Sequence, residues 1–151
     1  MDPDLMRRIA EEFIPFNRFL GLRALDVGPG AVTLEIPWRD ELVGDPVKGA
    51  MHGGVISMLA DTAGGLAVWS ALTSLASRVS TIDLRIDYLR PGKQEALRAE
   101  AHTVRVGKTV GVADVRLFQA SDPAATIATG KGVYAIRTAK GDPWPGVPAP
   151  E

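Results

Sequence analysis

One acidic residue, Asp61, lies within a long apolar segment that begins directly after the sequence His52-Gly53-Gly54. The first amides of a helix have no intrahelical acceptor, and the helix dipole favours negative charge beside them. Bare amides at the two glycines could therefore stabilise an oxyanion. Because burial disfavours the charged form of a carboxylate, we expect Asp61 to be tuned for taking a proton or attacking a carbonyl. Together these residues indicate acyl chemistry.

The spacing of Gly53 and Asp61 limits how both could act on one substrate. Along a helix they lie about 12 Å apart, whereas a reacting atom must lie about 3 Å from both groups. If both act on one carbonyl, a second chain must supply one of them, and two antiparallel copies of the helix would do so. Structural interpretations stay open: a flexible helix start at Gly53-Gly54, a satisfied buried acid at Asp61, and a loop held by His52 through a backbone hydrogen bond.

Composition disfavours several classes of protein. The 151 residues carry a formal net charge of −1 with scattered Lys and Arg, which does not support nucleic-acid binding. There is no cysteine, and the histidines His52 and His102 fall on different elements, so we expect no disulfide scaffold, thiol nucleophile or metal site. Asp61 interrupts the apolar segment 49–76, which disfavours a membrane span. The first residues lack the apolar core of a signal peptide, so we expect a cytoplasmic protein.

The elements that must position these residues follow from periodicity. Asp2-Pro3 and an apolar residue at every fourth position predict a short helix over 3–14, and the apolar segment predicts a central helix over about 53–72. Alternating apolar and polar residues predict two strands before the central helix and four after it. Such runs form an antiparallel sheet that must cover its apolar face. We therefore predict one α+β domain over 1–137, a curved antiparallel sheet wrapped around one long helix, with a Pro-rich tail over 138–151.

Several motifs resemble one family. The helix motif of the hotdog-fold acyl-CoA thioesterases resembles the segment Gly49–Ala63, GAMHGGVISMLADTA. The segment is most similar to the phenylacetate-pathway (PaaI-like) branch of the 4-hydroxybenzoyl-CoA thioesterase superfamily. Shorter segments fit the same pattern, namely Phe19–Leu22, Ser80–Leu84, Tyr88–Gly92, Gly107–Thr109 and Gly130–Gly132. The resemblance spans roughly residues 16–137 and implies a hotdog fold.

The resemblance also implies an activity, hydrolysis of an acyl-CoA thioester to a free acid and CoA. The Gly53 N–H is expected to polarise the thioester carbonyl. Asp61 of the partner subunit is expected to act as general base or nucleophile, and the Thr81 hydroxyl to position the water. The resemblance further implies a homodimer or a dimer of dimers, and no cofactor apart from the coenzyme A that belongs to the substrate.

Residues beside this centre are expected to bind the substrate. We expect His52 and Gly54 to contact it, and Arg90 and Lys108 to bind the phosphates of CoA. Many relatives carry an Asn in the loop before the histidine, whereas the nearest residue here is the acid Asp45. Two other functions stay open: a hotdog-fold hydratase or dehydratase of acyl thioesters, and a non-catalytic acyl-CoA-binding module.

Overall fold

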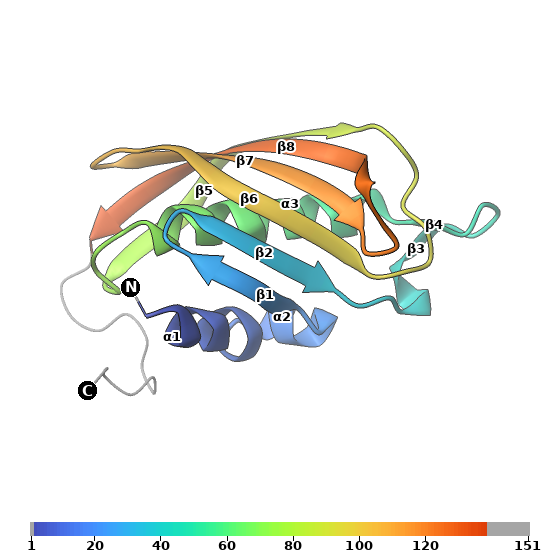
Figure 1. The fold of residues 1–151 in the computed structure, drawn as a ribbon, viewed down its shortest axis with the longest axis horizontal. Helices are drawn as coiled ribbons and strands as arrows, with labels where there is room; N and C mark the ends of the chain where they lie inside the picture. Colours follow the sequence, from blue (N-terminus) through green and yellow to red (C-terminus); the bar gives the residue numbers. More distant parts are fainter. Residues whose placement is uncertain (1, 139–151) are drawn as a thin grey trace.

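The computed structural model describes residues 2–138, in which a curved sheet, a long helix and a helical N-terminal segment pack together (Figure 1). The helices are α1 (Pro3–Arg8), α2 (Pro15–Leu20) and α3 (Gly53–Ser70), with a π-helical turn (Ile9–Phe13) before α2 and a 3₁₀ turn (Asp40–Leu42) after β2. The strands are β1 (Arg23–Gly28), β2 (Ala31–Ile36), β3 (Val43–Asp45), β4 (Ala50–Met51), β5 (Ser77–Tyr88), β6 (Leu97–Val106), β7 (Val110–Gln119) and β8 (Asp122–Thr138). Of the Pro-rich tail predicted over 138–151, Thr138 ends β8, and residues 139–151 lie outside the described part.

Within the described residues, six strands form one antiparallel sheet in the order β1-β2-β6-β7-β8-β5. The sheet curves over α3, which contacts β2, β5, β6, β7 and β8 (Figure 1). Two of these strands precede α3 and four follow it, so the predicted α+β architecture is confirmed. A small second sheet, in which β3 pairs with β4, was not predicted because strands of two and three residues are too short to show alternation.

The sheet covers only one side of α3. Leu59 and Ala63 face it and are fully buried. On the other side, Ser57, Asp61 and Gly65 recur every four residues and are only half-buried. An apolar segment of this kind predicts a helix buried on nearly every side, and in the single chain α3 departs from this on the Asp61 side. The reason is that the N-terminal segment covers that side only in part.

The N-terminal segment is more helical than predicted. The helix expected over 3–14 is α1 followed by the π-helical turn, and α2 occupies residues for which no helix was predicted. Pro15 starts α2 at a position where its missing N–H is not needed, and Gly21 ends the helix with a left-handed φ of 67°. Asn17 Nδ2 donates to the Ala10 carbonyl at 2.9 Å and joins α2 to the π-helical turn. A six-residue helix shows no periodic stripe, so periodicity could not reveal it.

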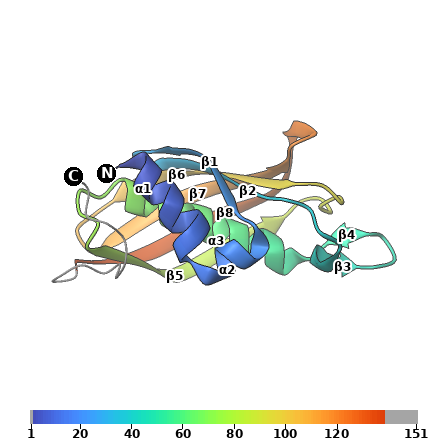
Figure 2. The same ribbon diagram turned by 90° about the horizontal axis from the view of Figure 1, so that it is seen from below.

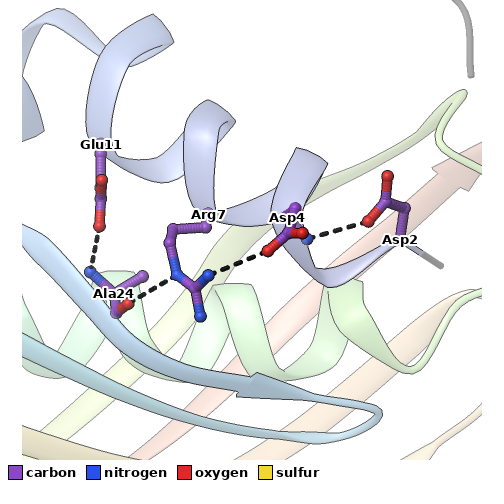
Figure 3. A network of polar contacts seen from close by, with 5 residues as sticks. All are labelled: Asp2, Asp4, Arg7, Glu11 and Ala24. Carbon is purple, nitrogen blue, oxygen red and sulfur yellow. Dashed lines mark hydrogen bonds and ion pairs between the residues drawn. The ribbon is translucent and has the colours of Figure 1, made fainter.

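The two edge strands of the sheet differ in their protection. At β1, the Ala24 N–H donates to Glu11 Oε1 at 2.7 Å, and the Ala24 carbonyl accepts from Arg7 Nε at 3.0 Å (Figure 3). These bonds occupy backbone groups that an edge strand would otherwise offer to another chain. β5 forms no pairing on its outer side within residues 2–138, and Ile82 and Tyr88 on it are 59% and 53% exposed. The sheet therefore has one protected edge and one open edge.

Candidate active site

Asp61 is positioned by two neighbouring strands. Thr81 Oγ1 on β5 donates to Asp61 Oδ1 at 2.7 Å, and the Tyr134 hydroxyl on β8 donates to the Asp61 carbonyl at 3.1 Å. Burial, and secondly the negative charge of Asp61, raise the pKa of Tyr134 above its usual value. The Tyr134 hydroxyl therefore stays protonated and remains a donor. The carboxylate is thus held through one oxygen, while its Oδ2 has no partner among residues 2–138.

The start of α3 leaves one amide free. His52 Nδ1 accepts from the Gly54 N–H at 2.8 Å, and the His52 carbonyl accepts from the Val55 N–H at 3.0 Å. His52 therefore caps the helix, and this bond requires an unprotonated Nδ1. Within the described residues the Gly53 N–H has no acceptor. Gly53 is thus the residue whose amide is available to an oxyanion, whereas the N–H of Gly54 is used inside the protein.

Tyr88 is a residue of this site that sequence reasoning missed. Its hydroxyl donates to the Gly53 carbonyl at 3.1 Å and contacts Ser57 Oγ, which donates to the same carbonyl at 3.0 Å. The ring lies against Gly53, because a Cβ there would be 3.4 Å from Tyr88 Cε1. Tyr88 therefore fixes Gly53 from β5, as Thr81 fixes Asp61. Alternation counts Tyr88 among the apolar residues of its strand, and nothing in the sequence pairs it with the helix start.

The structure brings the site residues together in two pairs, Asp61 with Thr81 and Gly53 with Tyr88. Positions 53 and 61 are separated by about 12 Å along the axis of α3, so the pairs do not meet in one chain. Both pairs lie where the half-buried side of α3 meets the open strand β5. Within residues 2–138 each chain therefore carries an amide without an acceptor at one place on this face and a carboxylate oxygen without a partner at another.

Arg90 and Lys108, the residues expected to bind phosphates, lie at opposite ends of the sheet. Arg90 follows the end of β5, is exposed, and donates to the Thr126 carbonyl at 3.0 Å. Lys108 is exposed in the turn between β6 and β7, which adjoins the other end of β8. Arg90 is therefore on the Gly53 side of the molecule and Lys108 is not. The structure does not bring the two together within one chain.

Asp45, the nearest match to the loop Asn of many relatives, bonds within its own loop. Its Oδ1 accepts from the Val47 N–H at 3.0 Å and from the Lys48 N–H at 3.1 Å. This is the usual way in which an Asp side chain stabilises a turn. Beside it, a Cβ at Gly44 would clash with His52, so β3 packs directly against the residue that caps α3. Asp45 thus shapes the loop before the helix.

A cavity of about 580 Å³ lies beside Asp61 and Thr81. Its walls come from α3, from β5 and from the N-terminal segment, which runs across α3 when the molecule is seen from below (Figure 2). Cavities of this size are typical of small-molecule sites. The residues between 2 and 138 contain no group of three His, Asp or Glu side chains that could hold a metal ion, and no helix there is long and apolar enough to cross a membrane.

Comparison with known proteins identifies the class to which this fold and site belong. The model of the thioesterase superfamily matches residues 48–126, which include α3, β5 and β6. The chain belongs to the thioesterase superfamily. The sheet wrapped around α3 is the hotdog fold of that superfamily, and the prediction of a hotdog-fold thioester hydrolase is confirmed. The PaaI-like branch and the roles of individual residues stay predictions.

Individual relatives resemble the chain over most of its length. The medium/long-chain acyl-CoA thioesterase YigI of Escherichia coli (strain K12) is 34% identical over 146 residues, 87% of this chain and 93% of its own. The VNG_1336C protein of Halobacterium salinarum is 42% identical over 124 residues, 78% of this chain and 82% of its own. A solved structure of a thioesterase family protein from Silicibacter pomeroyi superposes with a TM-score of 0.81 at 26% identity, covering 90% of this chain and 98% of that one.

Proposed function

We propose that the chain hydrolyses acyl-CoA thioesters at a site shared by two antiparallel copies. The observation that carries the proposal is that one chain holds two half-sites, Gly53 with Tyr88 and Asp61 with Thr81, on one open face. An oxyanion donor and a carboxylate that do not meet in one chain can meet across an interface. The choice of acyl-CoA is supported by the relative YigI, which is an acyl-CoA thioesterase.

A two-fold axis near Ser57 would bring the half-sites together. Ser57 lies midway between Gly53 and Asp61 in α3, and the corresponding point of β5 falls between Thr81 and Tyr88. Rotation about such an axis reverses the order of residues along both elements. Gly53 of each chain would then face Asp61 of the partner subunit, and β5 would lie beside its own copy. The resulting homodimer has two equivalent sites.

In this arrangement the Gly53 N–H donates to the thioester carbonyl oxygen and stabilises the oxyanion that forms on attack. As general base, Asp61 of the partner subunit takes a proton from water while the water oxygen bonds to the carbonyl carbon. The tetrahedral intermediate then expels the CoA thiolate by breaking the C–S bond, and the thiolate takes up a proton. As nucleophile, the carboxylate oxygen bonds to the carbon itself, the same C–S bond breaks, and water hydrolyses the resulting anhydride.

The geometry supports the two alternative functions, a hydratase or dehydratase and a non-catalytic binding module, less well than it supports hydrolysis. A hydratase or dehydratase needs an acid or base beside the reacting carbon in addition to Asp61, and His52 uses its Nδ1 to cap Gly54. A non-catalytic binding module does not require an oriented carboxylate, whereas Thr81 holds the Asp61 carboxylate in place on a wall of the cavity. For the CoA phosphates, Arg90 is available on the Gly53 side, whereas Lys108 would have to come from the partner subunit.

Mixing two inactive variants tests the shared site. Asp61→Asn removes the carboxylate and Gly53→Pro removes the N–H, so each homodimer should release CoA from acyl-CoA far more slowly than the natural protein. After refolding together, half of the dimers carry one intact site, and activity should return to about a quarter of the natural value. No recovery in mixtures shown to contain heterodimers would refute a site shared between chains. Failure of the natural protein to release CoA from any acyl-CoA would refute the activity itself.

A further inference from the structure

The cavity beside Asp61 has walls that belong to the rigid part of the fold. Its apolar lining includes Ile9, Ile14, Leu66, Trp69 and Val79. Ile9 and Trp69 are only 1% and 6% exposed, so they are core residues as well as wall residues. The N-terminal wall is tied to β1 by Arg7 and Glu11. An apolar ligand would therefore meet a preformed surface rather than a loose segment.

The length of the cavity limits the shape of that ligand. Along α3 its lining extends from Asp61 through Gly65 and Leu66 to Trp69, about 12 Å at the rise of a helix. An extended alkyl chain with bonds of about 1.52 Å advances about 1.25 Å per bond, so about eight to ten carbons fill this length. A phenylacetyl group, about 6 Å long, would occupy half of it. The cavity therefore suits a linear chain better than a short aromatic group.

The adjacent glycines Gly64 and Gly65 have different surroundings. A Cβ at Gly64 would clash with the Tyr134 hydroxyl, so Gly64 is required for packing. A Cβ at Gly65 would meet only the ring of Tyr134, at an ordinary distance of 3.4 Å, and Gly65 lines the cavity. Gly65 lies one helical turn after Asp61, on the same side of α3. The missing side chain at Gly65 therefore keeps open the space immediately beyond the carboxylate.

We propose that this cavity holds the acyl chain of the substrate, that the chain is linear with about eight to ten carbons, and that Gly65 sets its permitted length. The inference rests on the proposed function, since it places the thioester carbon at Asp61. The chain then runs from Asp61 past Gly65 towards Trp69, between α3 and the N-terminal segment. Each methylene buried there contributes about fourfold to kcat/KM.

A graded series at Gly65 tests the inference. The variants Gly65→Ala, Gly65→Val and Gly65→Leu fill the space next to Asp61 by one, three and four carbon atoms. The readout is the ratio of kcat/KM for decanoyl-CoA to kcat/KM for butyryl-CoA, in which a general loss of activity cancels. The ratio should fall step by step, on the order of a hundredfold for Gly65→Leu. Ile14→Trp narrows the cavity from the opposite wall and should lower the same ratio even if the Gly65 variants fold poorly.

A binding measurement separates this inference from the proposed activity. Calorimetry with decanoate as the probe needs no turnover, and Gly65→Leu should weaken decanoate binding while Glu12→Ala, an exposed change on the other side of the segment, should not. If acyl-CoA is hydrolysed but the ratio is the same in all variants, the chain-length role is wrong and the activity stands. If nothing is hydrolysed but decanoate binding depends on Gly65, the activity is wrong and the pocket stands. Preference for phenylacetyl-CoA over decanoyl-CoA would overturn the linear chain.

Discussion

At Asp61 the two carboxylate oxygens have different surroundings. Oδ1 is bonded to Thr81, and the backbone carbonyl of the same residue is bonded to Tyr134. Oδ2, without a partner in residues 2–138, is the oxygen that can reach water or a carbonyl carbon. In the proposed mechanism, a side chain fixed at both its backbone and its carboxylate has its reactive geometry before the substrate arrives, which lowers the entropy lost in the reaction.

Asp61→Asn should be the most damaging conservative change. The amide keeps the volume of the side chain, and Thr81 can still donate to its oxygen, so the fold should persist. What disappears is the negative charge that takes a proton from water or attacks the carbonyl, and kcat should fall by about 10²–10⁴-fold. Thiol release from acyl-CoA measures the loss, and sedimentation verifies that assembly is unchanged. Near-normal hydrolysis by a correctly assembled variant would refute the mechanism.

Tyr88→Phe should have a smaller effect on kcat. The ring still packs against Gly53, and Ser57 still donates to the Gly53 carbonyl, but one of two hydroxyl donors is gone. We expect kcat to fall up to about tenfold, which corresponds to about 1.4 kcal/mol, with little change in thermal stability. Steady-state kinetics and a melting curve test both parts. An unchanged kcat would show that Ser57 alone is enough to fix Gly53.

The sequence predicts the candidate reactive residues but not all of the side chains that hold them in place. Asp61 and Gly53 can be recognised from the sequence alone, because Asp61 is a charge within an apolar segment and Gly53 belongs to a pair of glycines at the start of that segment. Tyr88 could not be found in this way, because its role depends on where the end of β5 meets the start of α3. Gly64 and Gly65 look equivalent in the sequence, and only the position of Tyr134 separates them.

Among the elements, the N-terminal segment has two tasks, covering the β1 edge and lining the cavity. Glu11→Ala tests the first task. The Glu11 carboxylate accepts from the partly buried Ala24 N–H, and hydrogen bonds to charged groups contribute about 1.5–3 kcal/mol. We expect the free energy of unfolding to fall by about 1–2 kcal/mol in urea titrations at fixed protein concentration.

Glu12→Ala is the matched control for Glu11→Ala. Glu12 is the next residue, but its side chain is exposed. Its ion pair with Arg8 is a long i,i+4 contact of 3.9 Å between Glu12 Oε2 and Arg8 Nε. Such surface pairs contribute about 0.3–0.5 kcal/mol, so the free energy of unfolding should hardly change. Equal losses in the two variants would show that the bond to Ala24 does not hold the segment in place.

Long elements followed their sequence patterns, and short ones did not. α3 forms where the long apolar segment predicts a buried helix, and β6 and β7 show the expected alternation of buried and less buried residues over most of their length. α2, β3 and β4 contain six, three and two residues, too few for a period to appear. Their positions are decided by contacts distant in sequence, such as the Asn17 bond to Ala10 and the packing of Gly44 against His52.

In the whole molecule, the face of the sheet that points away from α3 is charged, whereas the open β5 edge exposes the apolar side chain of Ile82. Cross-strand ion pairs cover that face, with Glu100 bonded to Arg116 at 2.9 Å and Asp114 bonded to Lys131. A dimer of dimers formed through this face would have to remove both pairs from water, which is costly. The predicted tetramer would therefore need another surface, and we expect the dimer to be the main species in sedimentation.

Ile82→Lys should separate the dimer into monomers. Ile82 is 59% exposed at a bulge of β5, so a lysine there leaves the single chain intact but places a charge on the pairing edge. Val104→Lys is the matched control, because Val104 is 55% exposed at a bulge of β6, away from either edge. Ile82→Lys should lose both dimer and activity, and Val104→Lys should keep both. A monomeric Ile82→Lys protein with full activity would refute the dependence of catalysis on pairing.

The protection of β1 by Arg7 and Glu11 has a consequence for assembly. A sheet whose two edge strands both have unpaired backbone groups can add copies at both edges and grow without limit, as fibres do. Among residues 2–138, β5 is the one edge of the six-stranded sheet that stays open, so pairing of two copies through β5 would leave this sheet no second open edge, and its growth would stop at two chains. Two side chains of the N-terminal segment, Arg7 on α1 and Glu11 on the π-helical turn, would in this way decide whether high concentrations of the protein give a closed pair or an open polymer.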